Sequence, residues 1–291
     1  MPGPKPLSLA LFAICALFFG ASGCSSMLFF PSRLLYVDPA KEGFDFEEVR
    51  FPSYDGTSLY GWYFKHPKSA GPAKGVILYA HGNGGNISSQ FGNISYVLDH
   101  GYDYLAFDYR GYGSSGGNRP DPREAVGDTI AALRWADARA KAEHLPLFAF
   151  GQSLGTALLV RALVEEKATI HPKLIVLDSP FLSYEWGAAS VLSQHGLTTP
   201  FQPFVFFLVS DEWAPGRRIR ELAPTPILIF HGDRDRVIDY RLGLETYAAA
   251  GEPKEFVGVP GAGHIQSLWV KDREKYRTLL FARMDAAAKS E

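Results

Sequence analysis

The stretch that decides the fold runs from residue 147 to residue 164 and reads LFAFGQSLGTALLVRALV. Leu147 to Phe150 form an apolar run typical of a buried strand, and Thr156 to Val164 are mostly helix-forming residues. Between them, GQSLG (151–155) matches G-x-S-x-G, whose glycines permit a tight turn that exposes the serine hydroxyl. The stretch predicts a strand, a sharp turn and a helix, with Ser153 at the turn.

A second stretch, GSSGG at 113–117, matches the same pattern around Ser115. It is followed by NRPD (118–121), which indicates a loop and not a helix. We therefore expect Ser153, and not Ser115, to be the nucleophile. Residues 111–116 also fit G-x-G-x-x-G, but a dinucleotide-binding turn should open directly into a helix within the first βαβ unit. We expect no cofactor there.

Apolar runs like that before Ser153 recur along the chain, at 75–80, 104–107, 174–177 and 227–230. Helical patterns lie among them and after them, at 123–142, 154–166 and 268–286. Such alternation predicts an α/β fold with one mostly parallel sheet and helices on both of its faces. The strand-like stretches 46–51 and 58–64, joined by the turn signal Asp55-Gly56, predict an antiparallel hairpin leading into the sheet.

One segment, residues 182–224, breaks the alternation. It is rich in aromatic residues, including Tyr184, Trp186, Phe201, Phe204, Phe206, Phe207 and Trp213. We interpret it as a small helical lid inserted into a single domain that spans 45–286, and residues 201–213 as candidates for an apolar acyl pocket. An ordinary pair of core helices is the alternative.

A serine hydroxyl is a weak nucleophile and needs a base that a third group orients. His264 ends the loop PGAGH (260–264), which follows the strand-like stretch 254–259. Asp235 ends HGDRD (231–235), which follows another apolar run. The order serine, aspartate, histidine along the chain is one of three known orders for such a triad. We expect Ser153, Asp235 and His264 to form it.

Two other carboxylates could be written into that triad. Asp233 directly follows Gly232 and is expected to shape the turn through backbone hydrogen bonds. Asp239 comes after Val237 and Ile238, which have the character of packing residues. Asp235 is the better placed of the three.

Acyl transfer also needs N–H donors directed at the developing oxyanion. The residue after the nucleophile, Leu154, supplies one backbone amide. HGNGGN (81–86), which follows the apolar run 75–80, supplies the other, expected at Asn83. We interpret His81 as a structural residue that closes this turn.

Together, HGNGGN (81–86), FDYRGYGSSGG (107–117), GQSLG (151–155), HGDRDRVI (231–238) and GAGH (261–264) resemble the α/β-hydrolase superfamily. They are most similar to its small-lid branch, which includes protein depalmitoylases, bud-emergence-type hydrolases and serine aminopeptidase-like proteins. The resemblance covers roughly residues 28 to 285. It implies the triad and the oxyanion amides named above, and structural roles for Asp108 and Arg110.

The N-terminus has a different character. Lys5 precedes an almost wholly apolar run, Leu7 to Phe19, and then small residues that end at Cys24. This pattern resembles a bacterial lipoprotein signal and is too short to span a bilayer. We expect a signal peptide at 1–23, a lipidated Cys24 that anchors the protein to a membrane of the cell envelope, and a tether at 24–44. An ordinary signal peptide or an uncleaved anchor is the alternative.

Composition narrows the functional classes. The formal net charge of −2 provides no basic surface for nucleic acid, and no metal-binding motif or phosphate loop occurs in the sequence. We therefore expect a serine hydrolase of carboxylic esters or thioesters, acting on small or acylated substrates without a cofactor or a metal.

Two other functions stay open. One is an aminopeptidase with the same triad, in which Glu185, Asp211 or Glu212 would bind the substrate amine. The other is a non-catalytic envelope lipoprotein.

Overall fold

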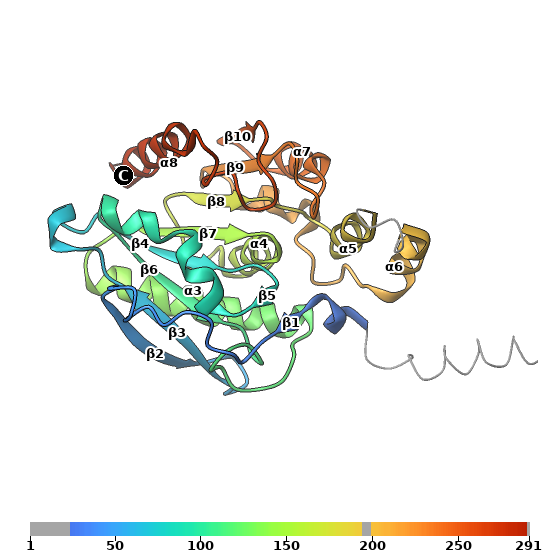
Figure 1. The fold of residues 1–291 in the computed structure, drawn as a ribbon, viewed down its shortest axis with the longest axis horizontal. Coiled ribbons are helices and arrows are strands. Elements are labelled where there is room, and N and C mark those ends of the chain that lie inside the picture. Colours follow the sequence, from blue (N-terminus) through green and yellow to red (C-terminus); the bar gives the residue numbers. More distant parts are fainter. Residues whose placement is uncertain (1–23, 194–198, 290–291) are drawn as a thin grey trace, which may run out of the picture.

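The computed structural model describes residues 24–193 and 199–289, which form one central sheet flanked by helices (Figure 1). The sheet has eight strands in the order β10-β9-β8-β7-β4-β6-β3-β2. The strands are β2 (Phe46–Pro52), β3 (Ser58–Phe64), β4 (Gly75–Ala80), β6 (Tyr102–Asp108), β7 (Leu147–Gln152), β8 (Ile175–Asp178), β9 (Ile227–Gly232) and β10 (Lys254–Val259). The β2–β3 and β3–β6 pairs are antiparallel, and the other neighbouring pairs are parallel.

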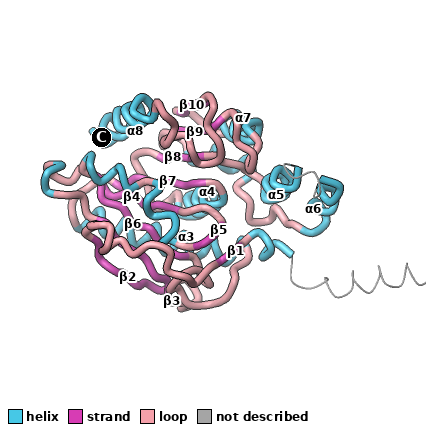
Figure 2. Tube along the Cα trace, in the orientation of Figure 1, coloured by secondary structure: helices cyan, strands magenta, loops and turns pink. Residues whose placement is uncertain are grey.

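Helices cover both faces of the sheet (Figure 2). On one face, α3 (Pro122–Ala142), α4 (Leu154–Glu166) and α7 (Tyr240–Ala249) contribute Leu133, Leu158 and Leu242 to one hydrophobic core. On the other face, the 3-10 helix η4 (Ser95–His100) and α8 (Arg273–Lys289) contribute Val97 and Phe281 to a second core. A sheet with two covered faces explains why its parallel strands read as continuous apolar runs.

The expected fold class is confirmed. The parallel strands and the leading hairpin lie where the apolar runs predicted them, with ends that differ by one or two residues. The last helix begins five residues later than expected, at Arg273. In the described residues, no helix has both the length and the apolar character needed to span a bilayer.

The segment expected to be a tether, 24–44, lies against the domain. It contains η1 (Cys24–Leu28) and β1 (Phe30–Pro31), which pairs in parallel with β5 (Gly84–Gly85). Phe29 is fully buried, so this segment contributes to the core. The signal peptide expected at 1–23 lies outside the described residues.

The segment expected to be a lid contains α5 (Tyr184–Ser193), η5 (Thr199–Phe201), α6 (Gln202–Leu208) and η6 (Gly216–Leu222). It follows the C-terminal end of β8. In Figure 1, α5 and α6 stand beyond the strand ends, on the side of the molecule where η1 lies.

Candidate active site

The turn between β7 and α4 places Ser153 at the C-terminal edge of the sheet. Ser153 has φ 50° and ψ −122°, a strained backbone conformation for a residue with a side chain. The two flanking glycines are required by close packing: a Cβ at Gly151 would lie 2.9 Å from Thr156 Cα, and one at Gly155 would overlap the carbonyl of Ala80. These contacts explain why the turn needs G-x-S-x-G.

The fold brings the three residues of the expected triad together. His264 Nε2 lies 2.9 Å from Ser153 Oγ, and His264 Nδ1 lies 2.8 Å from Asp235 Oδ2. A carboxylate can only accept, so Nδ1 carries the proton and Nε2 is free to accept one from the serine. The arrangement has the hydrogen-bond order needed to activate a serine hydroxyl.

Two backbone hydrogen bonds hold Asp235 in the orientation that its contact with His264 requires. Its other oxygen, Oδ1, accepts hydrogen bonds from the backbone amides of Val237 (2.8 Å) and Ile238 (2.9 Å). Burial would raise the pKa of the Asp235 carboxyl, but hydrogen bonds with His231 and His264 outweigh burial and hold that pKa below its usual range. The carboxylate is therefore charged at neutral pH.

The other two carboxylates have different partners. Asp233 Oδ1 accepts a hydrogen bond from the Gly261 amide at 2.6 Å, which joins the acid loop to the histidine loop. The sequence predicted a turn-forming role for Asp233 but not this partner. Asp239 caps α7, where it accepts a hydrogen bond from the Arg241 amide.

Ser179 lies under the site and was not expected from the sequence. The Ser153 amide donates to the carbonyl of Asp178, and Ser179 Oγ accepts a hydrogen bond from the Ile265 amide at 3.1 Å. The end of β8 therefore joins the turn that carries Ser153 to the histidine loop. The sequence signal was a polar Asp-Ser pair directly after an apolar run.

The two expected oxyanion amides belong to the residue after Ser153 and to the loop whose Gly82 lies beside Ser153. Leu154 is the first residue of α4, where an amide has no partner inside the helix. Gly82 lies next to Ser153, because a Cβ at Gly82 would be 3.6 Å from Ser153 Cβ. Asn83 follows, with its Oδ1 accepting from the Phe30 amide and its carbonyl from the Tyr112 hydroxyl.

Comparisons with known proteins point to one superfamily. A family model described as serine aminopeptidase, S33 matches residues 71–205. The uncharacterized protein YfhR of Escherichia coli (strain K12) is 31% identical over 235 residues, which are 79% of this chain and 78% of that protein. The chain belongs to the α/β-hydrolase superfamily.

Two further matches have named activities. Lysophosphatidylserine lipase ABHD12 of Danio rerio is 30% identical over 217 residues, 68% of this chain and 52% of that protein. The structure of the Pyrococcus furiosus esterase Pf2001 superposes with a TM-score of 0.68 at 21% identity, over 89% of this chain and 97% of that one. The first match adds a lipase to the relatives, and the second supports the fold.

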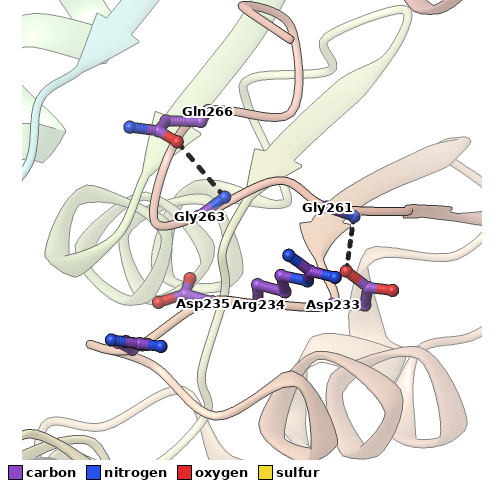
Figure 3. A pocket seen from close by; sticks show the side chains of 7 residues that line it. Asp233, Arg234, Asp235, Gly261, Gly263 and Gln266 are labelled. Atoms are coloured by element: carbon purple, nitrogen blue, oxygen red, sulfur yellow. Dashed lines mark hydrogen bonds between the residues drawn. The ribbon is translucent and has the colours of Figure 1, made fainter.

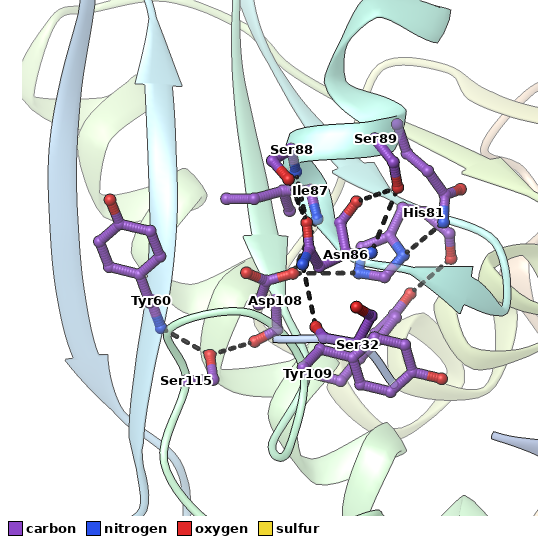
Figure 4. Close-up of polar contacts among 12 residues, drawn as sticks. Ser32, Tyr60, His81, Asn86, Ile87, Ser88, Ser89, Asp108, Tyr109 and Ser115 are labelled. Atoms are coloured by element: carbon purple, nitrogen blue, oxygen red, sulfur yellow. Dashed lines mark hydrogen bonds and ion pairs between the residues drawn. The ribbon is translucent and has the colours of Figure 1, made fainter. Parts of the chain in front are cut away.

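In this α/β-hydrolase, a buried polar cluster supports the loop that carries Asn83 (Figure 4). Asp108 Oδ1 accepts a hydrogen bond from the Ile87 amide at 2.8 Å and lies 3.8 Å from His81 Nε2. Burial raises the pKa of Asp108 to about 7 and lowers the pKa of His81 to about 4. His81 Nδ1 lies 2.7 Å from the carbonyl of Gly82, which agrees with a structural role in the turn.

Ser115, the serine of the second G-x-S-x-G match, belongs to the same cluster. Its hydroxyl donates to the carbonyl of Asp108 at 2.6 Å and accepts from the amide of Tyr60 at 2.8 Å. The Ser115 side chain is buried. Both partners of its hydroxyl are backbone groups, one on β3 and one on β6, so the hydroxyl joins two strands.

Arg110 anchors the loop after β6. Its guanidinium donates to Asp128 on α3 at 2.8 Å and to Asp55 in the β2–β3 turn at 2.8 Å. These ion pairs connect the hairpin, the loop and the helix, and they agree with the structural role expected for Arg110.

A polar cavity of about 610 Å³ opens beside the acid and histidine loops (Figure 3). Its lining residues are Asp233, Arg234, Asp235, Arg236, Gly261, Gly263 and Gln266. Ser153 and His264 are not among these lining residues, so the cavity borders the acid and histidine loops without including Ser153. The described residues contain no cluster of three potential ligands for a metal ion.

Proposed function

We propose that this hydrolase cleaves carboxylic esters or thioesters through an acyl-enzyme intermediate on Ser153. The observation that carries the proposal is the hydrogen-bonded chain from Ser153 through His264 to Asp235, at a strained turn between a strand and a helix. The named lipase among the relatives supports this reaction class.

The geometry supports the following steps. Ser153 Oγ attacks the acyl carbon while His264 Nε2 takes its proton, and Asp235 stabilises the imidazolium. The amides of Asn83 and Leu154 would stabilise the oxyanion. His264 then gives the proton to the departing alcohol or thiol. Water, deprotonated by His264, releases the carboxylic acid and restores the serine.

Labelling with a fluorophosphonate probe tests the nucleophile. We expect Ser153→Ala to abolish labelling, because the probe reacts with an activated serine. Ser115→Ala is the control, and it should retain labelling even where it destabilises the fold, since Ser115 holds two strands together. If only the Ser115 variant lost labelling, the assignment would be wrong. A folded wild-type protein that did not react would favour the non-catalytic lipoprotein.

A second candidate activity is an aminopeptidase, which the description of the family model favours. Such an enzyme needs a carboxylate for the substrate amine. Glu185 and Asp211 lie together, since Asp211 Oδ1 accepts a hydrogen bond from the Glu185 amide at 3.2 Å. Partial burial and the neighbouring Asp211 raise the pKa of Glu185. Comparing p-nitrophenyl esters with aminoacyl anilides distinguishes the activities: faster turnover of anilides, lost in Asp211→Asn, would favour the peptidase.

The proposal places the enzyme in a bacterial cell envelope, with lipid attached to Cys24. The sequence pattern that ends at Cys24 supports this lipidation. A single acyl chain binds a membrane only marginally, so stable anchoring needs two or more chains. We expect Cys24→Ser to abolish metabolic labelling with palmitate and to block signal cleavage. Equal palmitate incorporation in the wild type and the variant would contradict the anchor.

A further inference from the structure

The lid carries an unusually apolar outer surface. Within α6, Val205 is buried, whereas Phe204, Phe207 and Leu208 are 48%, 87% and 43% exposed. Trp186 on α5 is 46% exposed and packs edge-on against Phe206, with ring centroids 5.1 Å apart. We call these five exposed side chains, Trp186, Phe204, Phe206, Phe207 and Leu208, the α6 face. Residues 202–209 read QPFVFFLV and contain no charge.

Exposure on this scale excludes a purely internal role for the α6 face. A side chain that lines an acyl pocket is largely buried by its walls, but Phe207 keeps 87% of its surface exposed. Contiguous apolar surface of this kind marks a site for a partner or a membrane. Arg241 lies 5.6 Å from the ring of Trp186, so the α6 face has a cationic, aromatic edge of the type found at membrane interfaces.

The start of the described chain lies at the same edge of the molecule. Ser25 Oγ accepts a hydrogen bond from the Ser210 amide at 3.0 Å, two residues beyond the end of α6. Figure 1 shows η1 and α6 on the same side of the fold. Met27 and Phe30, in and after η1, are 59% and 61% exposed and add apolar surface there.

The position of Ser25 indicates what covers the α6 face. The apolar run Leu7 to Phe19 ends five residues before Cys24, and five extended residues reach at most about 17 Å. A bilayer that receives this run would therefore lie close to α6. An acyl chain on Cys24 would bring the bilayer equally close to α6, with or without the apolar run. Neither the apolar run nor a lipid on Cys24 would direct a second copy of the chain to this edge.

We propose that the α6 face docks into the surface of a phospholipid bilayer and holds the C-terminal edge of the sheet, with Ser153, toward the membrane. This inference goes beyond the proposed ester hydrolysis: it rests on the proposed membrane anchor and not on the reaction. It makes Phe207 the side chain that enters deepest, because Phe207 is the most exposed.

Site-directed fluorescence tests the docking. Cys15→Ser and Cys24→Ser remove both native cysteines from the full-length chain, and Phe207→Cys then provides one site for an environment-sensitive fluorophore. The matched control is Ser69→Cys, exposed in η2 (Lys68–Ala70), before β4 and thus at the opposite edge of the sheet. Both proteins are reconstituted with equimolar phosphatidylcholine and phosphatidylglycerol vesicles that carry a lipid-bound quencher.

We expect the label at 207 to be quenched about twofold or more relative to the label at 69, and to be shielded from aqueous iodide. Equal quenching at the two positions would overturn the proposal, as would protein that does not float with the vesicles. A label at 207 shielded from both quenchers in a dimeric protein would also overturn it, in favour of a second copy. Thermal unfolding of each variant checks that the substitution leaves the fold intact.

Discussion

At the residue scale, backbone strain is concentrated around the candidate nucleophile. Four non-glycine residues in the described part of the chain have positive φ, and three of them are Ser153, Ser179 and Ile265. Such conformations cost about 1–3 kcal/mol each, so they persist only where neighbouring contacts over-determine them. Here the contacts are the bond from the Ser153 amide to Asp178 and the bond from the Ile265 amide to Ser179. The strain positions the serine and the histidine loop relative to each other.

The first prediction concerns the acid. Asp235→Asn should lower kcat by ~10³-fold or more, since an amide cannot both hold the required imidazole tautomer and stabilise the imidazolium. Steady-state hydrolysis of a p-nitrophenyl ester by the purified variant measures this loss.

The matched control is Asp233→Asn, because Asp233 is two residues away and bonds to Gly261 instead of His264. Its kcat should fall far less. The acid would be misassigned if a folded Asp235→Asn enzyme kept nearly the wild-type kcat.

At the scale of elements, Asn86 connects the N-terminal segment to the loop that carries Asn83. Asn86 caps α2 (Ile87–Gln90) by accepting from the Ser88 amide. Its Nδ2 also donates to the carbonyls of Ser32 and Leu34, at 2.9 and 2.8 Å. One side chain therefore stabilises the start of a helix and the segment that follows β1.

The second prediction follows from this arrangement. Asn86→Ala should release residues 32–36 as well as destabilise the cap, and cost about 1 kcal/mol or more of unfolding free energy. Hydrogen exchange followed by mass spectrometry should show faster exchange in peptides that cover 32–36. Asp121→Ala, which removes the cap of α3, is the control and should leave those peptides unchanged. Unaltered exchange at 32–36 in the Asn86 variant would contradict the connection.

At the scale of the whole molecule, two buried groups near the active site oppose each other in the pH dependence of stability. Burial lowers the pKa of His81 to about 4, against 6.5 for an ordinary histidine, so acidification from about pH 6.5 to about pH 4 favours the unfolded chain. Burial raises the pKa of Asp108 to about 7, against 3.8 for an ordinary aspartate, so its stabilising contribution is fully present below pH 3.8 and is lost as pH rises from there to about 7. Between about pH 4 and pH 7 the two contributions nearly cancel.

The third prediction is that Asp108→Asn exposes the contribution of His81. Lowering the pH from about 7 to about 4.5 should reduce the unfolding free energy of this variant by ~2 kcal/mol more than that of the wild type. Urea unfolding of both proteins at the two pH values measures the difference. Taking the difference between the two pH values for each protein cancels any destabilisation that the substitution causes at both. If the unfolding free energies of the two proteins changed equally with pH, Asp108 and His81 would not make opposing contributions to stability.

The sequence by itself determined the features that depend on local pattern. The strands of the sheet, the turn at Ser153 and the order of Ser153, Asp235 and His264 were predictable, because burial on both faces produces apolar runs and the turn demands small flanking residues. Once the strands are parallel, loops after their C-terminal ends must meet at one edge. This rule explains why Ser153, Asp235 and His264, which each follow such a strand, approach one another.

Only the tertiary structure decided the contacts between distant segments. The docking of residues 24–44, the bond between Asp233 and Gly261 and the bond between Ser179 and Ile265 join loops that no local pattern relates. The exposure of Phe207 was equally hidden, since an aromatic residue in a lid reads the same whether it faces a pocket or the outside. Each of these features depends on how far a loop reaches in space, and side-chain periodicity carries information only along a single element.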